Sequence, residues 1–175
     1  MRLFVALELP ADVRAALAGW AAGAAPAAMR RVPEGNLHVT LAFLGERAPD
    51  DATAVATLLG DLARPVGELA VGGALWLPPR RPGVLAAALA AGPALGELHA
   101  GLVAALADAI GFEPERRALR PHVTVARARR DTRPRAGAPD PPPPALTFEP
   151  EALVLYRSHT GPGGARYEPL ARVGA

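Results

Sequence analysis

Two short motifs hold the residues with the clearest capacity for chemistry. His38 is followed by Thr40, and His122, nearly half a chain length later, is followed by Thr124 among similar apolar neighbours. The ordinary pKa of histidine lies near neutrality, so two histidines can supply both a general base and a general acid. In-line displacement at phosphorus needs both groups, and threonine hydroxyls can hold the phosphoryl oxygens as negative charge develops. The repetition therefore predicts proton-transfer chemistry at phosphorus that needs no metal ion.

Each motif is predicted to lie on a β-strand, at residues 36–44 and 121–127. Residues two apart on a strand share a face, so each strand would present its histidine and threonine together. Val39 and Val123, between them, would face the other way. The wide separation of the motifs suggests two similar lobes, and we expect the two strands to face each other across a cleft.

The elements that must position these motifs are a mixture of helices and strands. Apolar residues at helical spacing predict helices, and short β-branched or aromatic runs bounded by Pro or Gly predict strands. The predicted helices span residues 11–24, 50–62 and 95–110, and the further strands span residues 2–9, 68–77, 83–89, 146–157 and 165–173. Residues 136–145 contain a run of prolines and are expected to form an extended loop. Because no regular βαβ alternation is present, the expected fold class is α+β.

Length and composition favour one domain spanning residues 1–175. The net charge is only +2 and all 19 basic residues are arginine, so the high pI reflects the absence of lysine more than a large cationic excess. The absence of cysteine excludes disulfides, thiolate metal ligands and a cysteine nucleophile. Charged residues interrupt the apolar N-terminus, and no uncharged stretch is long enough for a membrane span, so we expect a cytoplasmic protein without membrane contact.

Longer passages around the motifs resemble a known family. These passages are MRLFVALELP at the N-terminus, NLHVTLAFLGE at 36–46, PPRRPGVL at 78–85, LRPHVTVARAR at 119–129 and LYRS at 155–158, followed by Tyr167 and Leu170. Together they resemble the two-histidine phosphoesterase superfamily, and within it the RNA 2′,3′-cyclic phosphodiesterases that are also described as 2′-5′ RNA ligases. The resemblance implies a bilobal, pseudo-symmetric fold in which two antiparallel sheets surround a central cleft and the helices lie outside.

The resemblance also implies an activity and the residues that perform it. His38, Thr40, His122 and Thr124 would be the catalytic four, opening a 2′,3′-cyclic phosphate on RNA or a nucleoside to a 2′-phosphomonoester. His38 would then act as the acid and His122 as the base. Separately from the resemblance, we expect a monomer that needs no cofactor. Two alternatives stay open: reversible 2′-5′ ligation of RNA at the same site, and a non-catalytic module that binds RNA ends or nucleotides.

Residues outside the catalytic four receive separate interpretations. Phe43 and Arg127 each lie five positions after a motif histidine, and we expect them to flank the substrate base. A zinc site would need a third ligand, and His99 is interpreted as structural on its predicted helix, so no metal is assigned. His159 is interpreted as a solvated loop residue. Arg80 and Arg81 could border an RNA groove, although a charged loop is more often only solvated.

Overall fold

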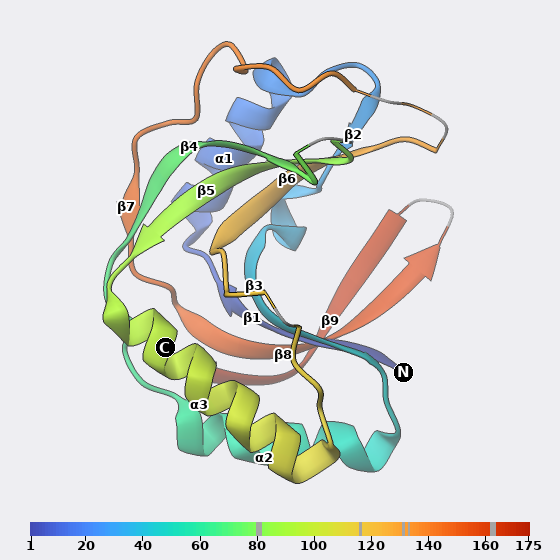
Figure 1. Cartoon of the computed structure of the whole chain (residues 1–175), viewed down its shortest axis with the longest axis vertical. Helices are drawn as coiled ribbons and strands as arrows, with labels where there is room; N and C mark the ends of the chain where they lie inside the picture. The colour runs from blue at the N-terminus through green and yellow to red at the C-terminus, as the bar shows by residue number, and fades with distance from the viewer. Residues whose placement is uncertain (80–81, 116, 131, 133, 162–163) are drawn as a thin grey trace.

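The strands of the described residues form one curved antiparallel sheet. The computed structural model describes residues 1–79, 82–115, 117–130, 132, 134–161 and 164–175. Its strands follow the order β7-β4-β5-β6-β3-β1-β8-β9, with the short β2 paired to β6 (Figure 1). The strand bounds are β1 Arg2–Glu8, β2 Met29–Arg31, β3 His38–Glu46, β4 Leu69–Leu77, β5 Val84–Ala91, β6 His122–Ala128, β7 Thr147–Phe148, β8 Ala152–Gly161 and β9 Gly164–Gly174. The α+β class is therefore confirmed.

The strands form two groups that meet at one point. One group contains β9, β8, β1 and β3, and the other contains β6, β5, β4 and β7. The groups are joined through β3 and β6 by a single antiparallel pair, Val39 opposite Val123. The two sheets expected from the sequence are thus continuous, because this one pair of strands closes the gap between them.

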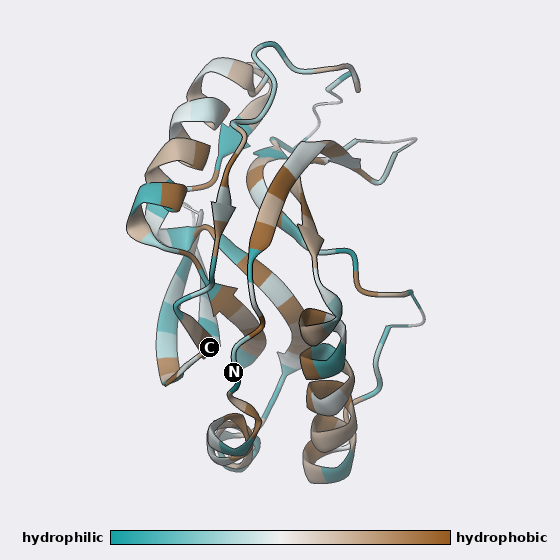
Figure 2. Ribbon diagram, turned by 90° about the vertical axis from the view of Figure 1, so that its left-hand side faces the viewer, coloured by the Kyte–Doolittle hydropathy of each residue, from teal (hydrophilic) through white to brown (hydrophobic). Residues whose placement is uncertain are grey.

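In the part of the chain that the structure describes, three α-helices cover the sheet. They are α1 Ala11–Ala24, α2 Pro49–Leu62 and α3 Pro93–Ile110, and a short 3-10 turn at Glu34–Asn36 leads into β3. Helix α1 packs against β2 and β6, whereas α2 packs against α3, β8 and β9. Apolar bands alternate with polar ones along these helices (Figure 2). Each helix can therefore pack an apolar side against its neighbours in the fold while a polar side faces solvent.

Helix α3 is the most apolar of the helices. Among the described residues it is the one helix that could cross a membrane by length and composition alone. Leu95, Leu98, Leu102 and Leu106 occur at helical spacing and are buried in the hydrophobic core. The helix ends at Gly111, which has a positive φ of 60° that a glycine adopts without strain. The apolar face of α3 is therefore packed in the core of this fold.

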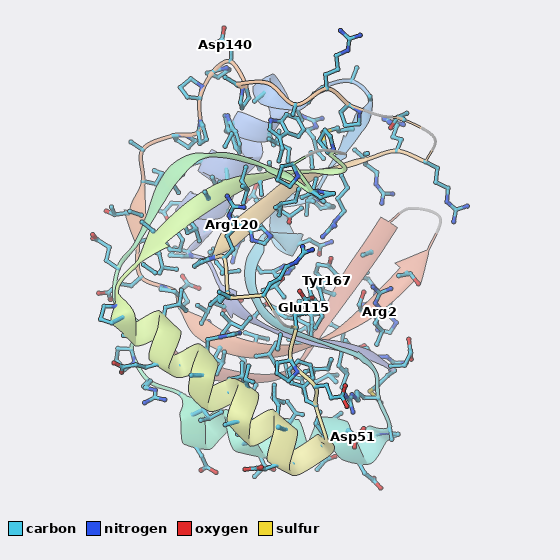
Figure 3. All side chains as sticks on the ribbon, in the orientation of Figure 1. Arg2, Asp51, Glu115, Arg120, Asp140 and Tyr167 are labelled. Atoms are coloured by element: carbon cyan, nitrogen blue, oxygen red, sulfur yellow. The ribbon has the colours of Figure 1, made fainter. Side chains whose placement is uncertain are left out.

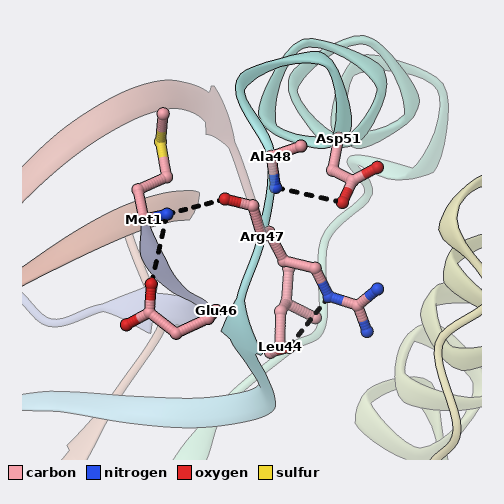
Figure 4. Close-up of polar contacts among 6 residues, drawn as sticks. All are labelled: Met1, Leu44, Glu46, Arg47, Ala48 and Asp51. Carbon is pink, nitrogen blue, oxygen red and sulfur yellow. Dashed lines mark hydrogen bonds and ion pairs between the residues drawn. The ribbon is translucent and has the colours of Figure 1, made fainter.

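The exit from β3 is anchored by polar contacts (Figure 4). The N-terminal ammonium of Met1 donates to the carbonyl of Arg47 at 2.6 Å and pairs with Glu46 at 3.2 Å. The Arg47 guanidinium donates to the carbonyls of Leu44 and Ile110, which ties the end of β3 to the end of α3. These contacts hold the strand that carries the first motif in a defined position between the N-terminus and the helices.

Two differences from the predicted elements have local causes. The closing strand expected at residues 146–157 is split into β7 and β8, because Pro150 cannot donate a hydrogen bond to a sheet ladder and interrupts the run. Strand β2 was not expected, and its three residues exist as a strand only through pairing with β6. Such a short segment carries no periodic signal of its own.

Candidate active site

The two motifs meet at the junction of the strand groups. Val39 and Val123, each fully buried, are paired between β3 and β6. In antiparallel register, the flanking positions bring His38 opposite Thr124 and Thr40 opposite His122. The structure therefore brings the four predicted side chains together, with histidine and threonine alternating around one point on the exposed side of the sheet.

The two motifs also match in how their strands pair with their neighbours. Residues 38–40 of β3 lie opposite Glu8, Leu7 and Ala6 of β1, and residues 122–124 of β6 lie opposite Ala88, Ala87 and Ala86 of β5. This equivalence relates the two strand groups by an approximate two-fold axis through the Val39–Val123 pair. The repetition in the sequence is thus a repetition in space.

A β-bulge follows the threonine of each motif. The register of β3 with β1 shifts between Ala6 and Val5, and the register of β6 with β5 shifts between Ala86 and Leu85. An extra residue at a bulge reverses the alternation of side chains along the strand. Phe43 and Arg127, an odd number of positions from the histidines, are consequently exposed on the same side as the motif histidines and threonines.

The same backbone contact orients both imidazoles. Nδ1 of His38 lies 2.7 Å from the carbonyl oxygen of Asn36, and Nδ1 of His122 lies 2.7 Å from the carbonyl oxygen of Arg120. A carbonyl oxygen can only accept, so each Nδ1 carries a proton and donates. Each Nε2 is thereby the nitrogen left to exchange protons with a substrate. The Nε2 of His38 lies 3.0 Å from the hydroxyl of Thr40.

His38 sits among aromatic rings that change its acidity. The rings of Phe4 and Tyr167 lie 4.9 Å and 5.3 Å from its imidazole, centroid to centroid, and Tyr156 lies at 6.2 Å. Burial is the main reason that the pKa of His38 is lowered from 6.5 to about 4; the Asn36 carbonyl opposes this shift, and the charges of Arg127 and His122 add to it. At neutral pH the imidazole is therefore uncharged in the free protein, and its Nε2 accepts the Thr40 hydrogen bond.

Among the described residues, two cavities lie beside the motifs. The larger, of about 810 Å³, is lined by Thr40, Phe43 and His122 together with α3 and the segment after it. The smaller, of about 80 Å³, is lined by Arg127 and Tyr167 among others. Arg120 lines the larger cavity and Tyr167 the smaller, and both are labelled near the centre of Figure 3. Phe43 and Arg127 therefore share a face of the sheet but line different cavities.

The other candidate residues lie outside this cluster. His99 is on helix α3, as predicted, and also lines the larger cavity. His159 is not a loop residue: it lies within β8, and its Nε2 pairs with Glu168 of β9 at 2.6 Å because the ordered β8–β9 ladder extends to the turn. Arg80 and Arg81 lie outside the described residues. Within the described part of the chain, no three His, Asp or Glu side chains are grouped to hold a metal ion.

Some residues of the site have no strong signal in the sequence. Asn36 contributes through its backbone carbonyl, which any residue type could supply, and only its position two before the histidine marks it. Tyr156 and Tyr167 reach His38 from β8 and β9, more than a hundred residues away along the chain. Their aromatic character alone could not have assigned them to this cluster.

Known proteins are similar to this chain over most of its length. The family model of the 2′-5′ RNA ligase superfamily matches residues 9–162. The RNA 2′,3′-cyclic phosphodiesterase of Escherichia coli (strain K12) is 32% identical, and the alignment covers 98% of this chain and 94% of that protein.

Solved structures show the same fold. The crystal structure of TT0787 from Thermus thermophilus superposes with a TM-score of 0.82 at 32% identity, covering 99% of this chain and 97% of that one. The structure of E. coli LigT complexed with 3′-AMP gives a TM-score of 0.78 at 31% identity, with coverage of 99% and 97%. The family-model match, the shared fold and the near-complete alignments lead to one conclusion: this chain belongs to the 2′-5′ RNA ligase superfamily.

Proposed function

We propose that the chain hydrolyses the 2′,3′-cyclic phosphate of an RNA end or nucleoside to a 2′-phosphomonoester, with His38 and His122 as the proton-transfer pair. The observation that carries the proposal is the matched placement of two His-x-Thr motifs on two paired strands, β3 and β6. The E. coli relative named an RNA 2′,3′-cyclic phosphodiesterase supports this substrate class.

The chemistry follows from two imidazoles and two hydroxyls around one phosphorus atom. One histidine takes a proton from a water molecule as its oxygen attacks phosphorus. The bond from phosphorus to O3′ breaks, and the other histidine gives its proton to that oxygen. Thr40 and Thr124 donate to the non-bridging oxygens, whose negative charge must be held during the displacement. In the free protein the Thr40 hydroxyl is bonded to His38, so the substrate phosphate must replace this contact.

The protonation state of His38 bears on which histidine is the acid. Its pKa of about 4 leaves it neutral in the free protein, a state that suits a base. The family resemblance implies the opposite role. His38 can serve as the acid only if the bound phosphate anion raises its pKa, which an adjacent negative charge does.

The larger cavity is suited to the nucleoside. Its volume of about 810 Å³ lies within the usual range for sites that enclose a small organic ligand. Phe43, whose side chain is 56% exposed, offers an exposed aromatic face at the edge of this cavity. The structure of E. coli LigT complexed with 3′-AMP supports nucleotide binding in this fold.

The test is hydrolysis of adenosine 2′,3′-cyclic phosphate in EDTA by the wild-type chain and by His38→Gln and His122→Gln. We expect both substitutions to lower kcat roughly 10²- to 10⁴-fold, and the wild-type product to be the 2′-phosphate alone. His159→Gln is the matched control, because it makes the same change at a histidine paired with Glu168 outside both motifs. Ligand binding without turnover by the wild-type chain would instead support the non-catalytic module.

A sulfur-substituted substrate separates the acid from the base. In an analogue with a bridging sulfur at the 3′ position, the thiolate leaves without needing a proton. Loss of the acid histidine is then tolerated, whereas loss of the base is not. Recovery of activity in His38→Gln would assign the acid to His38, and recovery in His122→Gln would assign it to His122.

Ligation is a second candidate, because the superfamily is named for 2′-5′ RNA ligases. The same displacement, with the 5′ hydroxyl of a second RNA in place of water, would form the P–O5′ bond, break the P–O3′ bond and leave a 2′-5′ linkage. Incubating two RNA halves that carry these ends, at high concentration, tests this directly. A 2′-5′ linked product that disappears in His38→Gln would establish ligation at the same site.

A further inference from the structure

The smaller cavity has a chemical character different from that of the larger one. It lies between strands β2 and β6 on one side and the start of β9 on the other, and its lining includes Arg30, Arg127 and Gly164. No carboxylate lines it among the described residues. At about 80 Å³ it is far below the size of a nucleoside site and suits a small group. Its lining therefore favours an anion of the size of a phosphate.

The two arginines are placed at a cost to folding. Arg30 of β2 and Arg127 of β6 lie directly opposite each other in antiparallel register, and both are exposed. Arg31 also lines the cavity, but only Arg30 and Arg127 are paired in register, and like charges in such a pair destabilise a sheet. Neither guanidinium forms an ion pair with a carboxylate among the described residues, so nothing there offsets the repulsion. A phosphate could stabilise two neighbouring guanidinium groups of this kind, because its oxygens accept hydrogen bonds from several N–H groups at once.

The guanidinium of Arg30 lies against Gly164 at the start of β9. A Cβ added at Gly164 would lie 3.0 Å from one terminal guanidinium nitrogen of Arg30 and 3.1 Å from the other. The guanidinium therefore lies against the bare backbone of Gly164, which has a φ of +114° that favours glycine. A residue of one strand group is in this way positioned against the hairpin of the other.

Three residues that line the smaller cavity also contact His38 or shift its pKa. The carbonyl of Asn36 orients the His38 ring, the ring of Tyr167 packs edge-on against it, and the charge of Arg127 lowers its pKa. All three also line the smaller cavity. A substrate whose cyclic phosphate lies at His38 would thus have a second anion site close by.

We propose that Arg30 and Arg127 form a second phosphate subsite, which binds the phosphate on the 5′ side of the terminal nucleotide. The subsite makes the chain select 5′-phosphorylated or internally linked RNA ends over nucleosides that carry the cyclic phosphate alone. This inference rests on the proposed hydrolysis and adds a substrate preference to it.

The test compares three substrates: adenosine 2′,3′-cyclic phosphate, its 5′-phosphorylated form, and the diadenosine dinucleotide ending in a cyclic phosphate. The first two differ only in the 5′ phosphate, and the third supplies it as an internal phosphodiester. We expect kcat/KM to be about tenfold higher for each of the two substrates with the second phosphate, the size expected from a charge-assisted hydrogen bond. The preference should decrease as salt is raised from 50 to 500 mM, roughly a threefold change in screening length.

Arg30→Gln identifies the residue responsible. In this variant, kcat/KM for the 5′-phosphorylated substrate divided by kcat/KM for adenosine 2′,3′-cyclic phosphate should fall to about one. The matched control is Arg64→Gln, the same change at an exposed arginine that lies against Gly101 of helix α3. Because Arg30→Gln removes a like-charge pair, its Tm should equal or exceed that of the wild-type chain.

The outcomes separate the two proposals. If the wild-type chain turns over none of the three substrates, the proposed hydrolysis is wrong. If it turns over all three equally, or if Arg30→Gln keeps the wild-type ratio, hydrolysis stands and the second subsite is wrong. The substrate comparison and its salt dependence need only the wild-type chain, so the proposal can be refuted even if a variant does not fold.

Discussion

Because His38 is neutral in the folded protein, we predict that its protonation at low pH favours the unfolded state. In the unfolded chain His38 takes up a proton near pH 6.5, whereas in the folded chain its pKa is about 4. Between these values the unfolded state binds a proton that the folded state does not. Proton binding therefore favours unfolding, and the contribution of His38 to stability is lost as the pH falls from 6.5 to 4.

The size of this effect follows from the two pKa values. Their difference corresponds to about 3 kcal/mol, of which about 2 kcal/mol is lost by pH 4.5. Glutamine cannot take up a proton in this range, so His38→Gln lacks this contribution. We expect the free energy of unfolding of the wild-type chain to fall by about 2 kcal/mol more than that of His38→Gln between pH 7 and pH 4.5.

Urea unfolding of both proteins at the two pH values measures this difference, because the other titrating groups are common to both. The ring proton resonances of His38, assigned by their loss in His38→Gln, report its pKa directly. Arg127→Gln should raise that pKa, since the guanidinium is one of the charges that lower it. Equal pH dependence in wild type and His38→Gln, or a His38 titration near 6.5, would refute the reasoning.

Three further changes test other parts of the molecule. Thr124→Val keeps the side-chain shape but removes the hydroxyl. It should lower kcat roughly 10- to 100-fold with a smaller change in KM, because an oxyanion donor acts mainly in the transition state. Steady-state kinetics would measure this, and an unchanged kcat would show that Thr124 is not part of the site. Phe43→Ala should raise KM for adenosine 2′,3′-cyclic phosphate roughly tenfold through the loss of base stacking, and an unaffected KM would place the base elsewhere. Leu102→Ala should lower the free energy of unfolding, measured by urea titration, by about 2–5 kcal/mol, because this leucine of α3 is fully buried. A loss under about 1 kcal/mol would contradict its place in the core.

Much of the fold could be predicted because it is encoded in local periodicity. Helix α1 matches its predicted bounds, 11–24, and α3 ends at Gly111 as expected. The motif strands were also predictable, since His-Val-Thr alternates between a solvent-facing and a buried face. The catalytic role of the four residues and the single-domain organisation remain predictions, because no observation in the structure measures either one.

Sequence by itself determined which chemical groups are present, that each histidine shares a strand face with its threonine, and that the two motifs are alike. Tertiary structure alone decided how the motifs meet, because the Val39–Val123 pair depends on how two distant strand groups fit together. The bulges are likewise set by pairing with β1 and β5, and they bring Phe43 and Arg127 to the cleft face, where strict alternation would have turned them away.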